Sequence, residues 1–121
     1  MTNEDVIARI NRCLKKADME EFYKASTDPD EDVEFVFDED GFLILFICHP
    51  RIHTPFRSED FQRIVWGRNR DRGTNYIALL FDNDDYLTIE EDGYTELQYN
   101  NKYYGTDLKI LQEEYKKLRQ S

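Results

Sequence analysis

Residues 42–48, Phe-Leu-Ile-Leu-Phe-Ile-Cys, form an unbroken apolar run that any fold of this chain must bury. The run is bounded by Gly41 and by His49-Pro50, and no other stretch is so continuously apolar. A short run rich in Phe and Ile is typical of a β-strand that is buried on both faces. It is too short to cross a membrane, which takes about 20 apolar residues.

An alternating segment precedes this run and predicts a partner strand for it. Val33, Phe35 and Phe37 recur at every second position, which indicates a strand with one apolar face. Residues 38–41, Asp-Glu-Asp-Gly, predict a tight turn, because glycine supplies the positive φ that such a turn needs. We therefore expect a β-hairpin over residues 33–48.

The rest of the chain divides into helical and strand patterns. Apolar residues at helical spacing predict an amphipathic helix over 3–17, and a second helix is expected from Ser58, as its cap, to about residue 69. The two prolines in residues 49–57 predict a loop. Residues 74–81, 86–91 and 94–99 predict a three-stranded meander, and Thr106 is the expected cap of a last helix.

This order of elements predicts an α+β fold with one domain over residues 1–121. We expect a single antiparallel sheet of about five strands, a hairpin plus a meander, packed on one face by three helices in the order α-β-β-α-β-β-β-α. The element order is similar to that of small secretion-chaperone-like folds, although no motif carries the likeness.

The charge balance limits the partners that this chain can have. The formal net charge is −10, from 26 acidic and 16 basic residues. Phosphates would be repelled over most of such a surface, which argues against direct nucleic-acid binding. Cys13 and Cys48 stand in apolar surroundings and are expected to be free thiols. The acidic start of the chain lacks the pattern of a signal peptide, so we expect a cytoplasmic protein with no membrane contact.

No metal or cofactor site is strongly indicated. Residues 28–39 space their acids like an EF-hand loop, but Val33 stands where the loop needs glycine and a strand pattern follows, so at most weak calcium binding is left open. Cys48, His49 and His53 fall short of the four ligands of a structural zinc site. We expect no cofactor and no metal.

Catalytic motifs are also lacking. The sequence has no glycine-rich phosphate loop, nucleophile elbow or paired-cysteine motif. We expect no catalytic residues, and a metal-dependent enzyme that uses carboxylates remains an alternative.

The arrangement of charges along the chain is the most informative functional feature. Residues 28–40 hold eight acids and no base, and residues 82–96 hold seven acids and no base. Residues 49–73 between them hold six arginines. This pattern predicts one acidic and one basic surface, with a solvated acidic face as the simpler interpretation.

The predicted function is protein binding without catalysis. We expect the acidic turns to stand in for phosphates and to occupy a basic, nucleic-acid-binding site on a partner protein, as inhibitors, immunity proteins or phage anti-defence proteins do. The candidate acidic contacts are Asp38, Glu39, Asp40, Asp82, Asp84, Asp85, Glu90, Glu91 and Asp92. A basic and aromatic patch is the second candidate contact, made of Arg63, Trp66, Arg68, Arg70 and Arg72.

The alternative function is that of a secretion-chaperone-like or regulatory adaptor. Such a protein would hold a segment of its partner on an apolar face and is compatible with a homodimer. The two hypotheses differ in the force that they use, because binding through carboxylates weakens with salt and binding through an apolar face does not.

Overall fold

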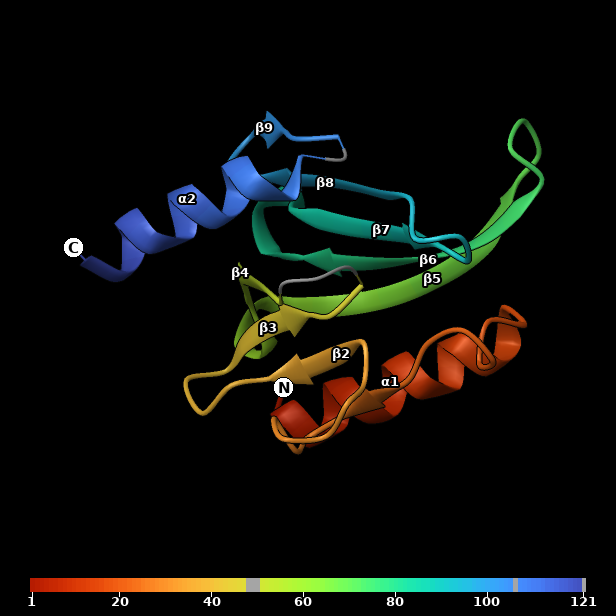
Figure 1. Cartoon of the computed structure of the whole chain (residues 1–121), viewed down its shortest axis with the longest axis horizontal. Helices are drawn as coiled ribbons and strands as arrows, with labels where there is room; N and C mark the ends of the chain where they lie inside the picture. Colours follow the sequence, from red (N-terminus) through yellow and green to blue (C-terminus); the bar gives the residue numbers. More distant parts are fainter. Residues whose placement is uncertain (48–50, 106, 121) are drawn as a thin grey trace.

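The computed structural model describes residues 1–47, 51–105 and 107–120, which form two helices, nine strands and two short 3₁₀ segments (Figure 1). In chain order, these elements are α1 (Asn3–Lys16), β1 (Ala25–Ser26), β2 (Phe35–Phe37), β3 (Phe42–Leu45), β4 (Ile52–Arg57), η1 (Ser58–Asp60), β5 (Phe61–Asn69), β6 (Thr74–Phe81), η2 (Asp82–Asp84), β7 (Tyr86–Glu90), β8 (Thr95–Tyr99), β9 (Lys102–Tyr103) and α2 (Leu108–Gln120).

The strands form two sheets, and the expected single sheet with three helices is wrong. The first sheet has four strands in the order β1-β2-β3-β4, with β1 parallel to β2 and the other pairs antiparallel. The second is a five-stranded antiparallel meander in the order β5-β6-β7-β8-β9. Figure 1 shows α1 along the lower side of the molecule and α2 at the upper left. The broad α+β class is confirmed.

The central apolar run forms a buried strand, as predicted, but the strand ends at Leu45, and the half-buried Phe46 and Ile47 lie beyond it. Strand β3 lies between β2 and β4, and its side chains are buried on both faces. Leu43 and Leu45 belong to the main core, whereas Ile44 packs with Val33 and Val36 on the other face. The β2–β3 turn is also as predicted, with Gly41 at φ +85°. Cys48, at the end of the run, lies outside the described residues.

The helix expected over residues 58–69 is instead the 3₁₀ segment η1 followed by strand β5. Ser58 does not cap a helix: its hydroxyl donates a hydrogen bond to Asn3 Oδ1. Strand β5 pairs with β6 from Phe61 to Asn69, and the chain reverses through a turn in which Gly73 has φ +69°. Ile64, Val65 and Trp66 are also good strand formers, so pairing with a neighbouring strand decides between two locally acceptable conformations.

The loop expected over residues 49–57 is partly strand β4. β4 is the edge strand of the first sheet, so Pro55 costs little there even though it cannot donate a backbone hydrogen bond. Helix α2 packs beside β4, where the side-chain oxygen of Gln112 accepts a hydrogen bond from the backbone N–H of His53 at 3.0 Å. Helix α2 confirms the last helix that the sequence predicts. The expected cap of this helix, Thr106, lies outside the described residues.

One continuous core joins the helices and both sheets. Leu79, Leu87 and Leu97 lie opposite one another on β6, β7 and β8 and are completely buried. Side chains from β2 and β3 and the apolar stripe of α1 belong to the same cluster. None of the described helices is long and apolar enough to span a membrane.

The side-chain alternation along β6 can be tested by replacing two neighbouring leucines. Leu79→Ala removes a fully buried side chain and should lower the free energy of unfolding by about 2–5 kcal/mol. Leu80→Ala, on the opposite, half-buried face, should cost less than about half as much. Urea denaturation measures both values, and equal losses would contradict the placement of the core.

Candidate functional site

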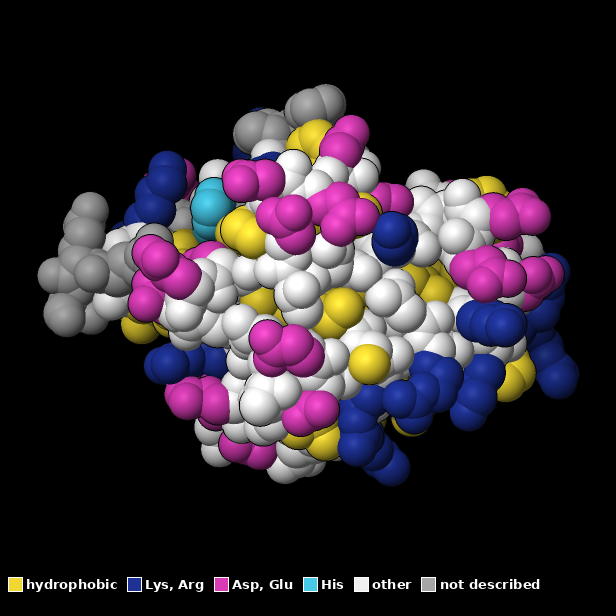
Figure 2. Space-filling view, turned by 90° about the horizontal axis from the view of Figure 1, so that it is seen from below, with side chains coloured by type: hydrophobic (Ala, Val, Ile, Leu, Met, Phe, Trp, Pro, Cys, Tyr) yellow, Lys and Arg dark blue, Asp and Glu magenta, His cyan; other side chains and the backbone are white. Residues whose placement is uncertain are grey.

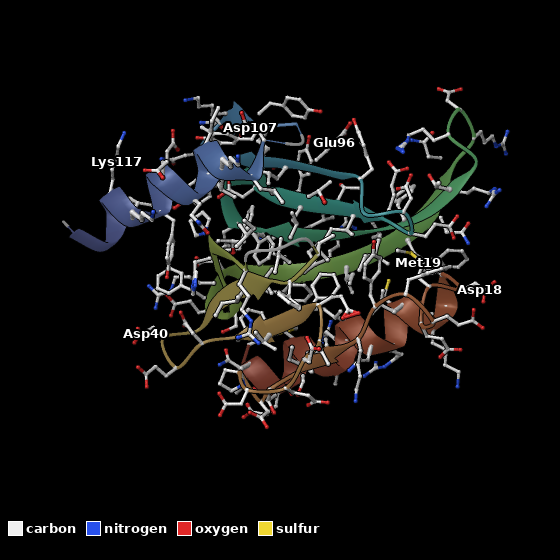
Figure 3. The ribbon with its side chains drawn as sticks, viewed as in Figure 1. Asp18, Met19, Asp40, Glu96, Asp107 and Lys117 are labelled. Carbon is white, nitrogen blue, oxygen red and sulfur yellow. The ribbon has the colours of Figure 1, made fainter. Side chains whose placement is uncertain are left out.

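Two of the three predicted acidic groups lie at one end of the molecule. Asp38, Glu39 and Asp40 occupy the β2–β3 turn, and Figure 3 shows Asp40 at the tip of this turn, at the left of the view. The η1 segment joins this turn to the second group, because Gly41 O accepts a hydrogen bond from the backbone N–H of Ser58 at 2.9 Å.

The second acidic group follows β6, and Asp60 of η1 links it to the first. Asp82, Asp84 and Asp85 occupy the β6–β7 turn, and Asp60 lies close enough to Asp82 and Asp85 for their charges to interact. We call Asp38, Glu39, Asp40, Glu59, Asp60, Asp82, Asp84 and Asp85 the acidic end.

The carboxylates of the acidic end repel one another. Partial burial raises the pKa of Asp60, and the charges of Glu59 and Asp82 raise it further, against the opposing charge of Arg57. Partial burial also raises the pKa of Asp85, as do the charges of Asp60 and Asp84, although a hydrogen bond from the Asn100 backbone N–H lowers it. Burial is the largest cause of both shifts, and the neighbouring carboxylates raise both pKa values further, so these carboxylates repel one another.

Some of these carboxylates also build the turns that carry them. Asp38 Oδ1 accepts hydrogen bonds from the backbone N–H groups of Asp40 and Phe42, at 2.9 and 3.0 Å. Asp85 Oδ1 accepts one from Asn100 N–H at 2.9 Å. Glu39 and Asp84 are exposed, so they are better placed than Asp38 and Asp85 to contact a partner.

The third acidic group, Glu90, Glu91 and Asp92, does not belong to the acidic end. Strand β7 separates the β6–β7 turn from the β7–β8 turn, so this group lies at the opposite end of the meander. Glu90 is only 4% exposed and lies beside Arg72, with 3.5 Å between Oε1 and Nε. Arg72 also pairs with Asp92 at 2.5 Å. Arg72 neutralises part of the charge of this group, and Glu91 accepts a hydrogen bond from the backbone N–H of Asn75.

The predicted basic and aromatic patch is likewise divided. Arg72 is occupied by Glu90 and Asp92, and its guanidinium carbon lies 4.2 Å from the ring centroid of Tyr94. Arg68 donates hydrogen bonds to Asn75 and to the backbone oxygen of Gly73. Arg70 is exposed in the β5–β6 turn.

The two remaining members of that patch, Arg63 and Trp66, line a groove with Arg9, Arg12 and Lys16 of α1. The patch predicted from residues 63–72 did not include these cations of α1. The sequence does contain a sign of the contribution of α1, because Arg9, Arg12 and Lys16 are spaced at i, i+3 and i+7, which places them on one side of a helix.

The acidic loop that resembles an EF-hand is held by its own hydrogen bonds. Asp28 Oδ1 accepts the backbone N–H of Asp30 at 2.9 Å. Ser26 and Lys24 both donate to Glu31, and these contacts lower the pKa of Glu31. Across residues 1–47, 51–105 and 107–120, no three His, Cys, Asp or Glu side chains converge on a point where a metal ion would sit. Cys48 and His49 lie outside these ranges.

The chain has no significant match among protein families, curated protein sequences or solved structures.

The raised pKa of Asp60, caused first by partial burial and then by neighbouring carboxylates, predicts a pH-dependent gain in stability for Asp60→Asn. Because the folded-state pKa of Asp60 is raised, its ionisation opposes folding at pH values above that pKa. The variant should be more stable than the wild type at pH 7, by up to about 1 kcal/mol for a group this exposed. The difference should shrink as the pH falls through the folded pKa towards the unfolded value of about 3.9.

Urea denaturation between pH 4 and pH 8 measures this difference. Asp71→Asn is the control, because it removes the same charge from an exposed position in the β5–β6 turn and should give no gain. A destabilised Asp60→Asn protein at pH 7, or a difference that grows on acidification, would contradict a raised pKa for Asp60.

Proposed function

We propose that this chain is a protein-binding domain without catalytic activity, and that its acidic end occupies a basic site on a partner protein. The observation that carries the proposal is the meeting of two acidic turns through η1, with Asp60 beside Asp82 and Asp85. Carboxylates that repel one another reduce the stability of the chain alone, and a cationic partner relieves that repulsion.

The chemistry of the acidic end favours a partner whose own site is built for phosphates. Glu39 and Asp84 are exposed on separate turns of the same end and offer carboxylate oxygens to Arg or Lys. A net charge of −10 also increases the rate of encounter with a basic surface. The proposed role is that of an antagonist that covers a nucleic-acid-binding site, of the inhibitor, immunity or anti-defence kind.

Three exposed carboxylates provide the test of this proposal. The triple variant Glu39→Gln, Asp40→Asn and Asp84→Asn removes three charges from the acidic end. Immobilised protein is used to capture partners from a lysate of the source organism, and bound material is eluted with a salt gradient. A basic protein should be retained by the wild type and bind the triple variant at least about tenfold more weakly, because long-range attraction and direct pairs are both lost.

A matched control removes three charges elsewhere. Asp18, Glu20 and Asp71 are exposed outside the acidic end, so Asp18→Asn, Glu20→Gln and Asp71→Asn together should leave capture near the wild-type level. Equal losses of partner capture in the two triple variants would mean that only the net charge of the chain affects binding, and would contradict a contact at the acidic end. Capture that survives high salt would instead favour the adaptor that uses an apolar face.

A further inference from the structure

A groove of about 420 Å³ lies between α1 and β5. Helix α1 contributes Arg9, Arg12 and Lys16, and β5 contributes Arg63 and Trp66. No carboxylate is among the described residues that line it. Figure 2 shows Lys and Arg side chains gathered in a band towards the right-hand side of the face seen from below. This volume is within the range of about 300–1,000 Å³ that is usual for small-molecule sites.

Stability of the helix explains these cations only in part, because Asp5 stands four residues before Arg9 but no acid stands three or four residues before Arg12 or Lys16. Arg9, Arg12 and Lys16 follow one another along one side of α1, and like charges three or four residues apart destabilise a helix. The dipole of α1 favours Lys16 in the last turn, but Arg9 and Arg12 lie further from the C-terminal end.

The cations of the groove also lack acidic partners within the chain. Among the described residues, none of Arg9, Arg12, Lys16 and Arg63 forms an ion pair with a carboxylate. In a chain with 26 acidic residues, a concentration of four unpaired cations indicates an anionic ligand.

Trp66 gives the groove an aromatic wall. It lies opposite Ile77 in the β5–β6 ladder, yet it is 54% exposed because β5 is the edge strand of its sheet. The four consecutive residues 63–66 all line the groove, so the groove follows the edge of the strand and not one of its faces. An exposed indole beside arginines is suited to stacking against a planar ring.

We propose that this groove binds a nucleotide, whose phosphates contact Arg9, Arg12, Lys16 and Arg63 while its base stacks on Trp66. Charge-assisted hydrogen bonds from guanidinium groups are the strong contacts to phosphate. Cys13 also lines the groove, and burial raises the pKa of its thiol, so it remains neutral and does not repel the ligand.

A compact ligand fits the charge distribution better than a nucleic-acid strand does. The screening length in physiological salt is about 8 Å, so a ligand inside the groove experiences mainly the nearby cations. A strand that continued past the groove would run along the surface of a chain with a net charge of −10. The ligand class is therefore a mononucleotide.

Intrinsic fluorescence tests the proposal directly, because Trp66 is the only tryptophan of the chain. Titration of the full chain with ATP should change the emission of Trp66 in a saturable way. Arg12→Ala should weaken binding about tenfold through loss of one charge-assisted contact, and the variant should fold because alanine favours helix. Arg70→Ala removes an exposed cation outside the groove and should bind ATP as the wild type does.

Fragments of the nucleotide separate the two parts of the site. By calorimetry, tripolyphosphate should bind more weakly than ATP, adenosine should not bind, and Trp66→Ala should reduce the affinity for ATP to that of tripolyphosphate. The proposal is overturned if ATP causes no saturable change, if Arg12→Ala and Arg70→Ala bind alike, or if tripolyphosphate binds the wild type as tightly as ATP. Tighter binding of a single-stranded oligonucleotide than of ATP would also overturn it, in favour of a nucleic-acid strand.

Discussion

The chain passes from the first sheet to the second through Ser58–Asp60, and the placement of both charged regions depends on this connection. The backbone N–H of buried Ser58 donates to Gly41 O, and its hydroxyl donates to Asn3. These contacts hold the start of α1, the β2–β3 turn and the start of β5 together. Because the connection is short, Asp60 is brought next to the β6–β7 turn, and α1 is brought alongside β5.

The parts of the fold that could be predicted were those in which local pattern and burial agree. The run at residues 42–48 is apolar at every position, so a strand buried on both faces was the natural outcome for β3. Phe61, Ile64 and Val65 satisfy helical spacing as well as strand propensity, and the decision depended on pairing with β6, which no local window contains. The division into two sheets also depends on strand pairing, so it could not be predicted from local sequence. β4 and β5 are adjacent in sequence but belong to different sheets.

The candidate site was only partly predictable from residue types. The acidic turns are visible in the sequence, but the strand pairing that places residues 90–92 at the opposite end of the meander is not. Nor does the sequence show that Arg72 pairs with Glu90 and Asp92. The helix expected from Ser58 would place Asp60 in its first turn, and that expectation does not bring Asp60 beside Asp82. The cations of α1 were visible as a regular spacing, yet their meaning depended on a neighbour, Arg63, that is more than 40 residues away in the sequence.

The position of β5 at the border of its sheet has a consequence for the behaviour of the protein at high concentration. An unpaired strand edge of nine residues is a template on which another copy can add a strand and start a fibril. Helix α1 lies beside this edge and brings Arg9 and Arg12 near Arg63 of β5. A helix beside an edge strand and charged side chains next to it both oppose the addition of another strand, so this arrangement disfavours aggregation.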